Sequence, residues 1–303
     1  MGGGWPPAGT LGPAGAPAPP TASPAPAPRA RRDVLLWRIY GEECDNYMML
    51  QGHKNAVTEL RWTGDGETIV TASSDKTARA WDAQTGAQKK KMGEHEGYVN
   101  SCDVARRGND LVVTGADDGA AKVWDLRQRR SVATFAGPYP VLSAAFSADS
   151  DMVCAAGLDG AVRVFDLRRQ ELWMELLGHH EPVTGLAVSP DGNFLLSNAM
   201  DNSLRVWDLR PYAPANRCVK VFAGHVHSFE QNLLRCAWSP DGAQVSCGSA
   251  DGMVNVWDAA SRRLLYKLPG HKGSVNDVVF HPKEPLCASA SSDKTVYLGE
   301  LSL

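Results

Sequence analysis

The chain has 303 residues, of which 43% are hydrophobic and 21% are charged, so it can bury a sizeable core. Its 31 basic and 34 acidic residues leave a formal net charge of −3, which disfavours a protein that grips nucleic acid mainly by neutralising phosphates. No apolar run reaches the length of about 18 residues that a membrane-spanning helix requires, so we expect none.

Residues 1–32 differ in composition from the rest of the chain. They hold nine of the 19 prolines and very few large apolar side chains. Such a segment cannot bury enough surface to offset the entropy of ordering it, so we expect a disordered Pro/Ala-rich tail. The basic run RARR at 29–32 reads either as a nuclear-import patch or as a solvated boundary. One folded domain is expected over residues 33–303.

A unit of 41 to 50 residues recurs from residue 47 onward. Five units end in an aromatic residue followed by Asp, at Trp81, Trp124, Phe165, Trp207 and Trp257. An Asp lies six residues before each of these aromatic residues, and a sixth unit has an Asp at the corresponding position. These residues are Asp75, Asp118, Asp159, Asp201, Asp251 and Asp293. Further upstream, five units carry a His: His53, His95, His179, His225 and His271. This pattern resembles the WD40 repeat family, in which each repeat builds a four-stranded propeller blade.

The fourth unit shows how each repeat divides into strands. Residues 174–178 predict an outer strand, 183–189 the innermost, 193–199 the second and 203–209 the third, with the turns SPDG and AMDN between the last three. The chain is therefore predicted to be all-β, a WD40 β-propeller of six full blades plus the remnant of a seventh, where the family form has seven. Residues 33–41 read as a third strand of that remnant, while 46–51 could supply the outer strand of the last blade.

The resemblance implies that one His, one Ser or Thr, the turn Asp and the Trp form a hydrogen-bonded chain inside each blade. Three units hold the full set: His53, Thr71, Asp75, Trp81; His95, Thr114, Asp118, Trp124; and His179, Ser197, Asp201, Trp207. Two units hold part of it: His225, Asp251, Trp257; and His271, Ser289, Asp293. A buried carboxylate needs such donors, so these residues are interpreted as structural. The third unit departs most, with Pro138, Ala155 and Phe165 at the other places, and is expected to depend on packing.

No motif for chemistry stands out beside the repeats. The sequence has no phosphate-binding loop, no nucleophile elbow and no H-E-x-x-H motif. His179, His180 and Glu181 resemble metal ligands, but the first belongs to a blade and the second to an exposed turn, and the same objection applies to His225 and His227. We therefore expect no catalytic, cofactor or metal site and no enzyme activity. The seven cysteines show no C-x-x-C pair and are expected to be reduced and buried.

The loops are where binding is expected. The fifth unit is the longest, and its extra residues fall in 210–218 and 225–234. Arginine and aromatic side chains dominate interface energetics, and loops on a rigid scaffold carry function. The candidate partner-binding residues are Arg106, Arg107, Arg210, Tyr212, His227 and Phe229. An alternative for the aromatic candidates is that they cover the edge of their own blade. An alternative for paired basic residues such as Arg106 and Arg107 is that they are solvated surface.

Longer stretches carry a more specific resemblance. Residues 99–119, 195–214 and 261–282 resemble the spliceosomal WD40 proteins of the U5 small nuclear ribonucleoprotein. The resemblance implies a non-catalytic scaffold subunit in the nucleus that acts in pre-mRNA splicing. It also implies contacts with the particle's large scaffold protein and RNA helicase, indirect contact with U5 RNA, and no membrane or small-molecule substrate. The alternative is a substrate receptor of a cullin-type ubiquitin ligase, suggested by WDLR at 124–127 and 207–210.

Overall fold

The computed structural model describes residues 32–40, 45–108, 110–228, 230 and 232–301. Every regular element among these residues is a β-strand, and no helix there is long and apolar enough to cross a membrane. Apart from Arg32, the expected Pro/Ala-rich tail lies outside the described residues, as does Phe229.

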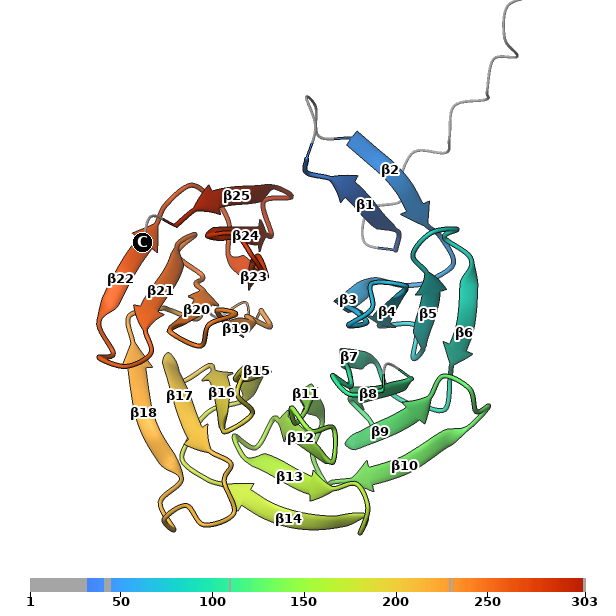
Figure 1. The fold of residues 1–303 in the computed structure, drawn as a ribbon, viewed down its shortest axis with the longest axis horizontal. Coiled ribbons are helices and arrows are strands. Elements are labelled where there is room, and N and C mark those ends of the chain that lie inside the picture. The colour runs from blue at the N-terminus through green and yellow to red at the C-terminus, as the bar shows by residue number, and fades with distance from the viewer. Residues whose placement is uncertain (1–31, 41–44, 109, 229, 231, 302–303) are drawn as a thin grey trace, which may run out of the picture. The chain divides into compact units, whose positions relative to one another are not determined.

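Five sheets have four antiparallel strands each, in chain order from the inner to the outer strand (Figure 1). They consist of β3 (Val57–Trp62), β4 (Thr68–Ser73), β5 (Ala78–Asp82) and β6 (Gln88–Met92); β7 (Val99–Val104), β8 (Leu111–Ala116), β9 (Ala120–Asp125) and β10 (Ser131–Ala136); β11 (Val141–Phe146), β12 (Met152–Gly157), β13 (Val162–Asp166) and β14 (Glu171–Leu176); β15 (Val183–Val188), β16 (Phe194–Ala199), β17 (Ser203–Asp208) and β18 (Cys218–Ala223); and β19 (Cys236–Trp238), β20 (Gln244–Gly248), β21 (Val254–Asp258) and β22 (Leu264–Leu268).

Two further sheets are smaller. A three-stranded sheet holds β23 (Val275–Phe280), β24 (Leu286–Ser291) and β25 (Val296–Glu300), and a two-stranded sheet holds β1 (Val34–Arg38) and β2 (Asp45–Leu50). Figure 1 shows the seven sheets arranged around a central opening, with β25 and β1 on either side of a gap. The prediction of an all-β propeller with six blades and the remnant of a seventh is confirmed.

The pair β1 and β2 is the outer half of a further blade. In the complete sheets the register between the third and fourth strands shifts immediately before the aromatic residue, as at Ala80/Trp81 and Val206/Trp207. The β1–β2 pair shows the same shift at Leu36/Trp37, which makes β1 a third strand, as its sequence predicted. The expectation that residues 46–51 complete the last blade is wrong, because β2 pairs with β1. A local hairpin closes a far shorter loop than pairing with the other end of the chain.

Neighbouring sheets are joined near the central opening by side chains of the innermost strands. The backbone N–H of Cys102 donates to Glu59 at 3.1 Å, and that of Phe146 donates to Asp103 at 2.9 Å. Between the sheets lie apolar cores; in one of them Leu176 of the third sheet packs with Leu195 and Trp207 of the fourth. Each blade is therefore held by its neighbours as well as by its own strand pairing.

The turn that follows the second strand has a left-handed residue directly after its Asp. Gly119, Gly160 and Gly252 fill this place in three blades with φ between 74° and 79°. Lys76 has a φ of 67° there and Lys294 one of 71°, a conformation that costs a side-chain-bearing residue about 1–2 kcal/mol. The turn matters because it sets the direction of the adjacent Asp carboxylate.

Candidate functional site

The polar residues of the first blade form one connected chain. Trp81 donates its indole N–H to Thr71 Oγ1 at 2.9 Å, and Thr71 Oγ1 lies 2.7 Å from His53 Nε2. His53 Nδ1 lies 3.0 Å from Asp75 Oδ2. Asp75 also accepts hydrogen bonds from the Lys54 backbone N–H at 3.0 Å and from the Thr77 hydroxyl at 2.6 Å.

The donors in this chain fix the histidine tautomer. Burial raises the pKa of Asp75, but the hydrogen bonds from Thr77, Lys54 and His53 outweigh it and lower the pKa to about 2, so the carboxylate is ionised. An ionised carboxylate only accepts, so His53 carries its proton on Nδ1. Thr71 then donates its hydroxyl proton to His53 Nε2 and accepts from Trp81. Burial lowers the pKa of His53, which keeps the ring neutral.

Two other blades repeat this geometry closely. The His–Asp distance is 2.8 Å in the second blade and 2.9 Å in the fourth, and the hydroxyl lies 2.7 Å from the ring in both. The residues are His95, Thr114, Asp118 and Trp124 in the second blade, and His179, Ser197, Asp201 and Trp207 in the fourth. In the last blade His271 lies 3.3 Å from Asp293 and 2.9 Å from Ser289, and Tyr297 packs against the ring at 4.4 Å. These polar side chains therefore bind one another within their own blades.

The third blade replaces hydrogen bonds by aromatic packing. Phe165 stands at the tryptophan place and stacks on Phe135 with ring centroids 4.6 Å apart and planes at 16°. Asp159 has no histidine partner there; instead it accepts from Arg163 at 2.5 Å. Arg163 also pairs with Glu175 at 2.9 Å. The turn Asp is thus present in this blade without the chain that surrounds it elsewhere.

The fifth blade corrects one expectation. His225, Asp251 and Trp257 were expected to form a partial network, but neither ring nitrogen of His225 has a hydrogen-bond partner among the described residues. The hydroxyl place is taken by Cys247, whose thiol donates to the Gly248 carbonyl instead. Asp251 pairs with Lys267 at 3.0 Å. A thiol is a weak hydrogen-bonding group, so His225 is held by packing against Trp257, at 6.0 Å between centroids.

The expected partner-binding residues fall into two groups. Tyr212 is fully exposed, and Arg107 is exposed apart from an ion pair with Asp149 at 3.2 Å. Arg210 instead binds within its own turn, where its guanidinium donates to the Asp208 carboxylate with nitrogen–oxygen distances of 2.5 to 3.1 Å. The WDLR arginine therefore stabilises the turn.

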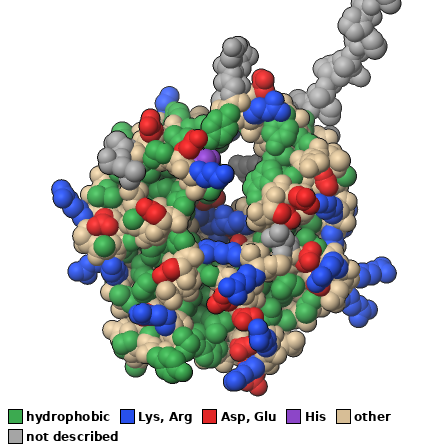
Figure 2. Space-filling view, in the orientation of Figure 1, with side chains coloured by type: hydrophobic (Ala, Val, Ile, Leu, Met, Phe, Trp, Pro, Cys, Tyr) green, Lys and Arg blue, Asp and Glu red, His purple; other side chains and the backbone are tan. Residues whose placement is uncertain are grey.

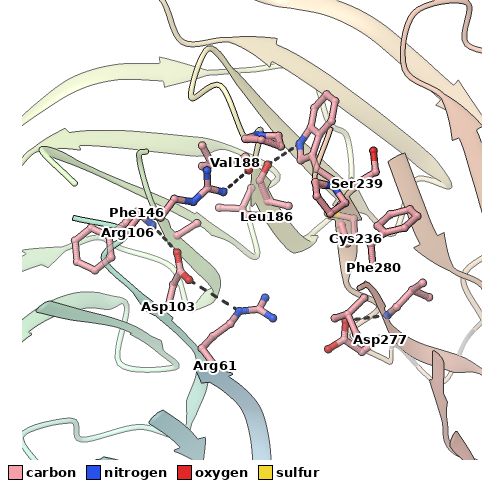
Figure 3. A pocket seen from close by; sticks show the side chains of 18 of the residues that line it. Arg61, Asp103, Arg106, Phe146, Leu186, Val188, Cys236, Ser239, Asp277 and Phe280 are labelled. Carbon is pink, nitrogen blue, oxygen red and sulfur yellow. Dashed lines mark hydrogen bonds and ion pairs between the residues drawn. The ribbon is translucent and has the colours of Figure 1, made fainter. Parts of the chain in front are cut away.

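Two candidates have partners within this chain, and for His227 the expectation of an exposed side chain is wrong. His227 was expected to be an exposed anchor, but it lies partly buried against His225 and near Asn198, whose amide is 3.3 Å from Nε2. Burial lowers the pKa of His227 to about 4. Arg106 reaches from the second blade to the fourth, where it donates to the carbonyls of Val188 at 2.7 Å and Ser189 at 2.9 Å (Figure 3).

A cluster of charged side chains from different blades fills part of the central opening. Arg235 donates to the carbonyls of Asn100 and Thr184, each at 2.7 Å, and its guanidinium lies 3.3 Å from Glu59. Arg61 pairs with Glu59 at 2.7 Å. Figure 2 shows Lys and Arg side chains at the margin of this opening, and Figure 3 shows Arg61 pointing toward Asp103. We call Glu59, Arg61, Asp103, Arg235 and Asp277 the channel cluster.

Within the channel cluster Glu59 and Arg235 are buried, whereas Arg61 and Asp103 are half-buried. The charge of Glu59 is the largest cause of a raised pKa at Arg61, whereas burial raises the pKa of Asp103 and of Asp277. Beside it a cavity of about 330 Å³ opens, lined by Arg61, Asp103, Arg106 and Asp277 together with apolar residues such as Phe146 and Phe280 (Figure 3). The channel cluster was not predicted from the sequence. Its signal in the sequence is the set of charged residues in or directly before the innermost strands, such as Glu59, Asp103 and Arg235.

The described residues include no group of three or more His, Cys, Asp and Glu side chains placed to hold a metal ion. The sequence His179, His180 and Glu181 resembles a set of metal ligands. In the structure His179 is hydrogen-bonded to Asp201 and Ser197, whereas His180 is exposed.

Known proteins share both the repeats and the whole domain. The WD domain, G-beta repeat family matches residues 44–82, 86–125, 129–166, 170–208, 216–258 and 262–298. The human "U5 small nuclear ribonucleoprotein 40 kDa protein" is 52% identical over 89% of this chain and 75% of its own length. The protein of the same name from Dictyostelium discoideum is 49% identical over 89% of this chain and 76% of its own length. The "Pre-mRNA-splicing factor cwf17" of Schizosaccharomyces pombe is 42% identical over 89% of this chain and 79% of its own length. The chain therefore belongs to the WD-repeat family, in the group that includes the WD40 protein of the U5 small nuclear ribonucleoprotein.

Proposed function

We propose that this chain is a non-catalytic scaffold subunit of the U5 small nuclear ribonucleoprotein that acts in pre-mRNA splicing in the nucleus. The observation that carries the proposal is the 52% identity to the human U5 protein over nearly the whole propeller. Similarity to a splicing factor of fission yeast points to the same process. Since the matched region spans 89% of this chain, most of the propeller has a counterpart in these relatives.

The geometry supports a binding role over a chemical one. In four blades the repeat histidine and the turn carboxylate bind each other, as His53 and Asp75 show. Large apolar side chains are exposed instead on loops, among them Tyr98, Tyr139, Leu177 and Tyr212. Exposed aromatic residues on loops carried by a rigid scaffold favour protein–protein contact.

Protein partners fit the surface better than RNA does. We propose that the chain contacts the particle's large scaffold protein and lies near its RNA helicase, reaching U5 RNA only through them. The net charge of −3 supports this assignment, as does the pairing of many arginines with carboxylates on the same chain, such as Arg107 with Asp149 and Arg168 with Asp151. Bases would need exposed stacking platforms beside free cationic groups.

Affinity purification from nuclear extract tests the proposal. The tagged full chain is expected to recover U5 RNA and the large scaffold protein, and Tyr212→Ala to reduce that recovery without changing the melting temperature, because Tyr212 is fully exposed. Val132→Ala, at an exposed position on β10, serves as the matched surface control. Recovery of a ubiquitin-ligase adaptor without spliceosomal RNA would replace the proposed function by the ligase alternative.

A further inference from the structure

The fifth blade lacks an apolar side chain that most other blades have. Four blades place a leucine directly after the third strand: Leu126, Leu167, Leu209 and Leu301. The first three pack into the apolar cluster that each blade shares with the blade before it, and Leu301 is buried. In the fifth blade this residue is Ala259. The places are equivalent, because in all five blades the residue donates its backbone N–H to the carbonyl directly before the second strand, at 2.7 to 2.9 Å.

The fifth blade also lacks the ion pair that follows the leucine elsewhere. In the second and third blades the next residue is an arginine that pairs with an Asp directly before the second strand, Arg127 with Asp110 at 3.5 Å and Arg168 with Asp151 at 3.1 Å. In the fifth blade both places hold alanine, Ala260 and Ala243. The leucine, the arginine and its carboxylate are thus all replaced by alanine at one point between the fourth and fifth blades.

A cavity of about 370 Å³ lies at this point. Its apolar walls come from both blades and include Phe194, Val206, Val219, Trp238 and Ala259. We call it the Ala259 pocket. Since leucine occupies the equivalent place in four blades, the pocket fits an aliphatic side chain of that size.

The first blade shows that alanine alone does not open a pocket. Its residue at this place is Ala83, which is 9% exposed. Leu50 lies in the same apolar cluster and Met48 packs against that cluster, so larger neighbours cover the alanine. Ala259 has no such cover, since Val219 at the wall of its pocket is 47% exposed.

The carboxylates at the pocket favour a basic residue beside the aliphatic one. Asp191 and Asp241 line the pocket and are exposed. Asp241 accepts from the Ser239 hydroxyl and from the Ala243 backbone N–H within its own turn. Among the described residues no lysine or arginine is paired with it, so its charge is open to a cation from outside.

The lysine at the pocket is already bound. Lys220 donates to the carbonyls of Ala259 and Ala260 at 2.5 and 3.0 Å. Lys90 donates to carbonyls of the corresponding turn in the second blade, beside Arg127. A lysine in this position is therefore compatible with a neighbouring guanidinium.

A separate partner fits the pocket better than a second copy. Among the described residues every leucine that is followed by an arginine is buried or half-buried within its own propeller, as Leu126 and Leu209 are. A second copy would have to withdraw such a leucine from its core in order to offer it.

We propose that the Ala259 pocket binds a segment of a partner protein in which a leucine-sized aliphatic side chain lies next to an arginine or lysine. The aliphatic side chain takes the place that Leu209 takes one blade earlier, and the cation pairs with Asp241. The proposal goes beyond the scaffold function and does not depend on it, because it concerns one pocket of the isolated chain.

A labelled peptide with the sequence of residues 124–130, WDLRQRR, provides the probe, because it carries the leucine and arginine that the fifth blade lacks. Fluorescence anisotropy with the full chain is expected to show saturable binding. The matched peptide WDAAQRR, with the two alanines of the fifth blade, is expected to bind at least about tenfold more weakly, since it buries no aliphatic side chain.

Two variants of the chain test the two halves of the pocket. Ala259→Leu fills the pocket, so it is expected to abolish peptide binding and to raise the melting temperature. The matched control is Ala136→Leu, at an exposed position on the outer strand β10, which is expected to change neither. Asp241→Asn keeps an acceptor for the turn but removes the charge, and is expected to weaken binding about threefold.

The outcomes separate the alternatives. Absence of saturable binding by WDLRQRR, equal binding by WDAAQRR, or binding that Ala259→Leu leaves unchanged overturns the proposal. If Ala259→Leu lowers the melting temperature, the difference between the two peptides and the loss with Asp241→Asn remain the expected results. Sedimentation that shows a dimer abolished by Ala259→Leu would assign the pocket to a second copy and reject the partner segment. The assay uses the purified chain alone, so its failure would leave the recovery of U5 RNA from nuclear extract as a separate test of the scaffold function.

Discussion

Replacing Asp201 by Ala tests whether the turn carboxylates hold the blades together. Asp201 accepts from the Ser203 hydroxyl at 2.6 Å and the Ser203 backbone N–H at 2.9 Å, and its Oδ2 lies 2.9 Å from His179 Nδ1. Hydrogen bonds to a charged group each contribute about 1.5–3 kcal/mol and do not add fully, so we expect a loss of about 3 kcal/mol. For a domain of this size that lowers the melting temperature by roughly 6–10 °C.

The third blade offers a control of equal burial. The Asp159 side chain is 15% exposed, against 11% for Asp201, but it has no histidine partner, and Arg163 retains Glu175 when Asp159 is removed. Asp159→Ala is therefore expected to cost about 1 kcal/mol. Differential scanning fluorimetry of both variants at pH 7 measures the two shifts in melting temperature. Equal shifts for the two, or no shift for Asp201→Ala, would refute the argument that the His–Asp contact and its neighbours stabilise a blade.

Three further predictions concern stability. Burial lowers the pKa of His225 and of His227 to about 4, below the 6.5 of the unfolded chain, so the unfolded state binds more protons in this range. The unfolding free energy therefore falls as the pH is lowered from about 6.5 to 4. A urea midpoint that is unchanged from pH 7.5 to pH 5 would contradict this. Arg235→Met leaves Glu59 without one of its cations and should lower the unfolding free energy by about 3–5 kcal/mol in urea titrations, whereas a loss below about 1 kcal/mol would show the arginine to be dispensable. Lys76→Gly relieves a positive φ and should raise the urea midpoint by the equivalent of about 0.5 kcal/mol; a lowered midpoint would contradict backbone strain at this turn.

The repeating parts of the fold could be predicted because their interactions stay within one unit. His53 and Asp75 are 22 residues apart, and the same separation of 22 or 23 recurs wherever the pair forms. Strand periodicity, turn chemistry and the position of the tryptophan all lie within the same stretch. A repeated local pattern is the kind of signal that one sequence can show by itself.

The errors and omissions have physical reasons. The channel cluster joins residues from different blades, with Arg235 bonded to Asn100 across 135 positions, and no local pattern encodes such a contact. The fifth blade was assigned a network because His225 and Asp251 are present, yet Cys247 replaces the hydroxyl and Asp251 pairs with Lys267, so neither ring nitrogen has a partner among the described residues. His227 was interpreted as exposed because it lies in a long loop, but its ring turns back against His225.

The reach of Arg235 has a consequence for how the molecule melts. Repeat proteins whose units touch only their neighbours can lose structure one unit at a time. Here one guanidinium from the fifth blade binds backbone or side-chain atoms of the first, second and fourth blades at once. Fraying that starts at the open side of the ring would have to break this junction before it could pass through the middle blades. We therefore expect cooperative unfolding in a single transition despite the gap between β25 and β1.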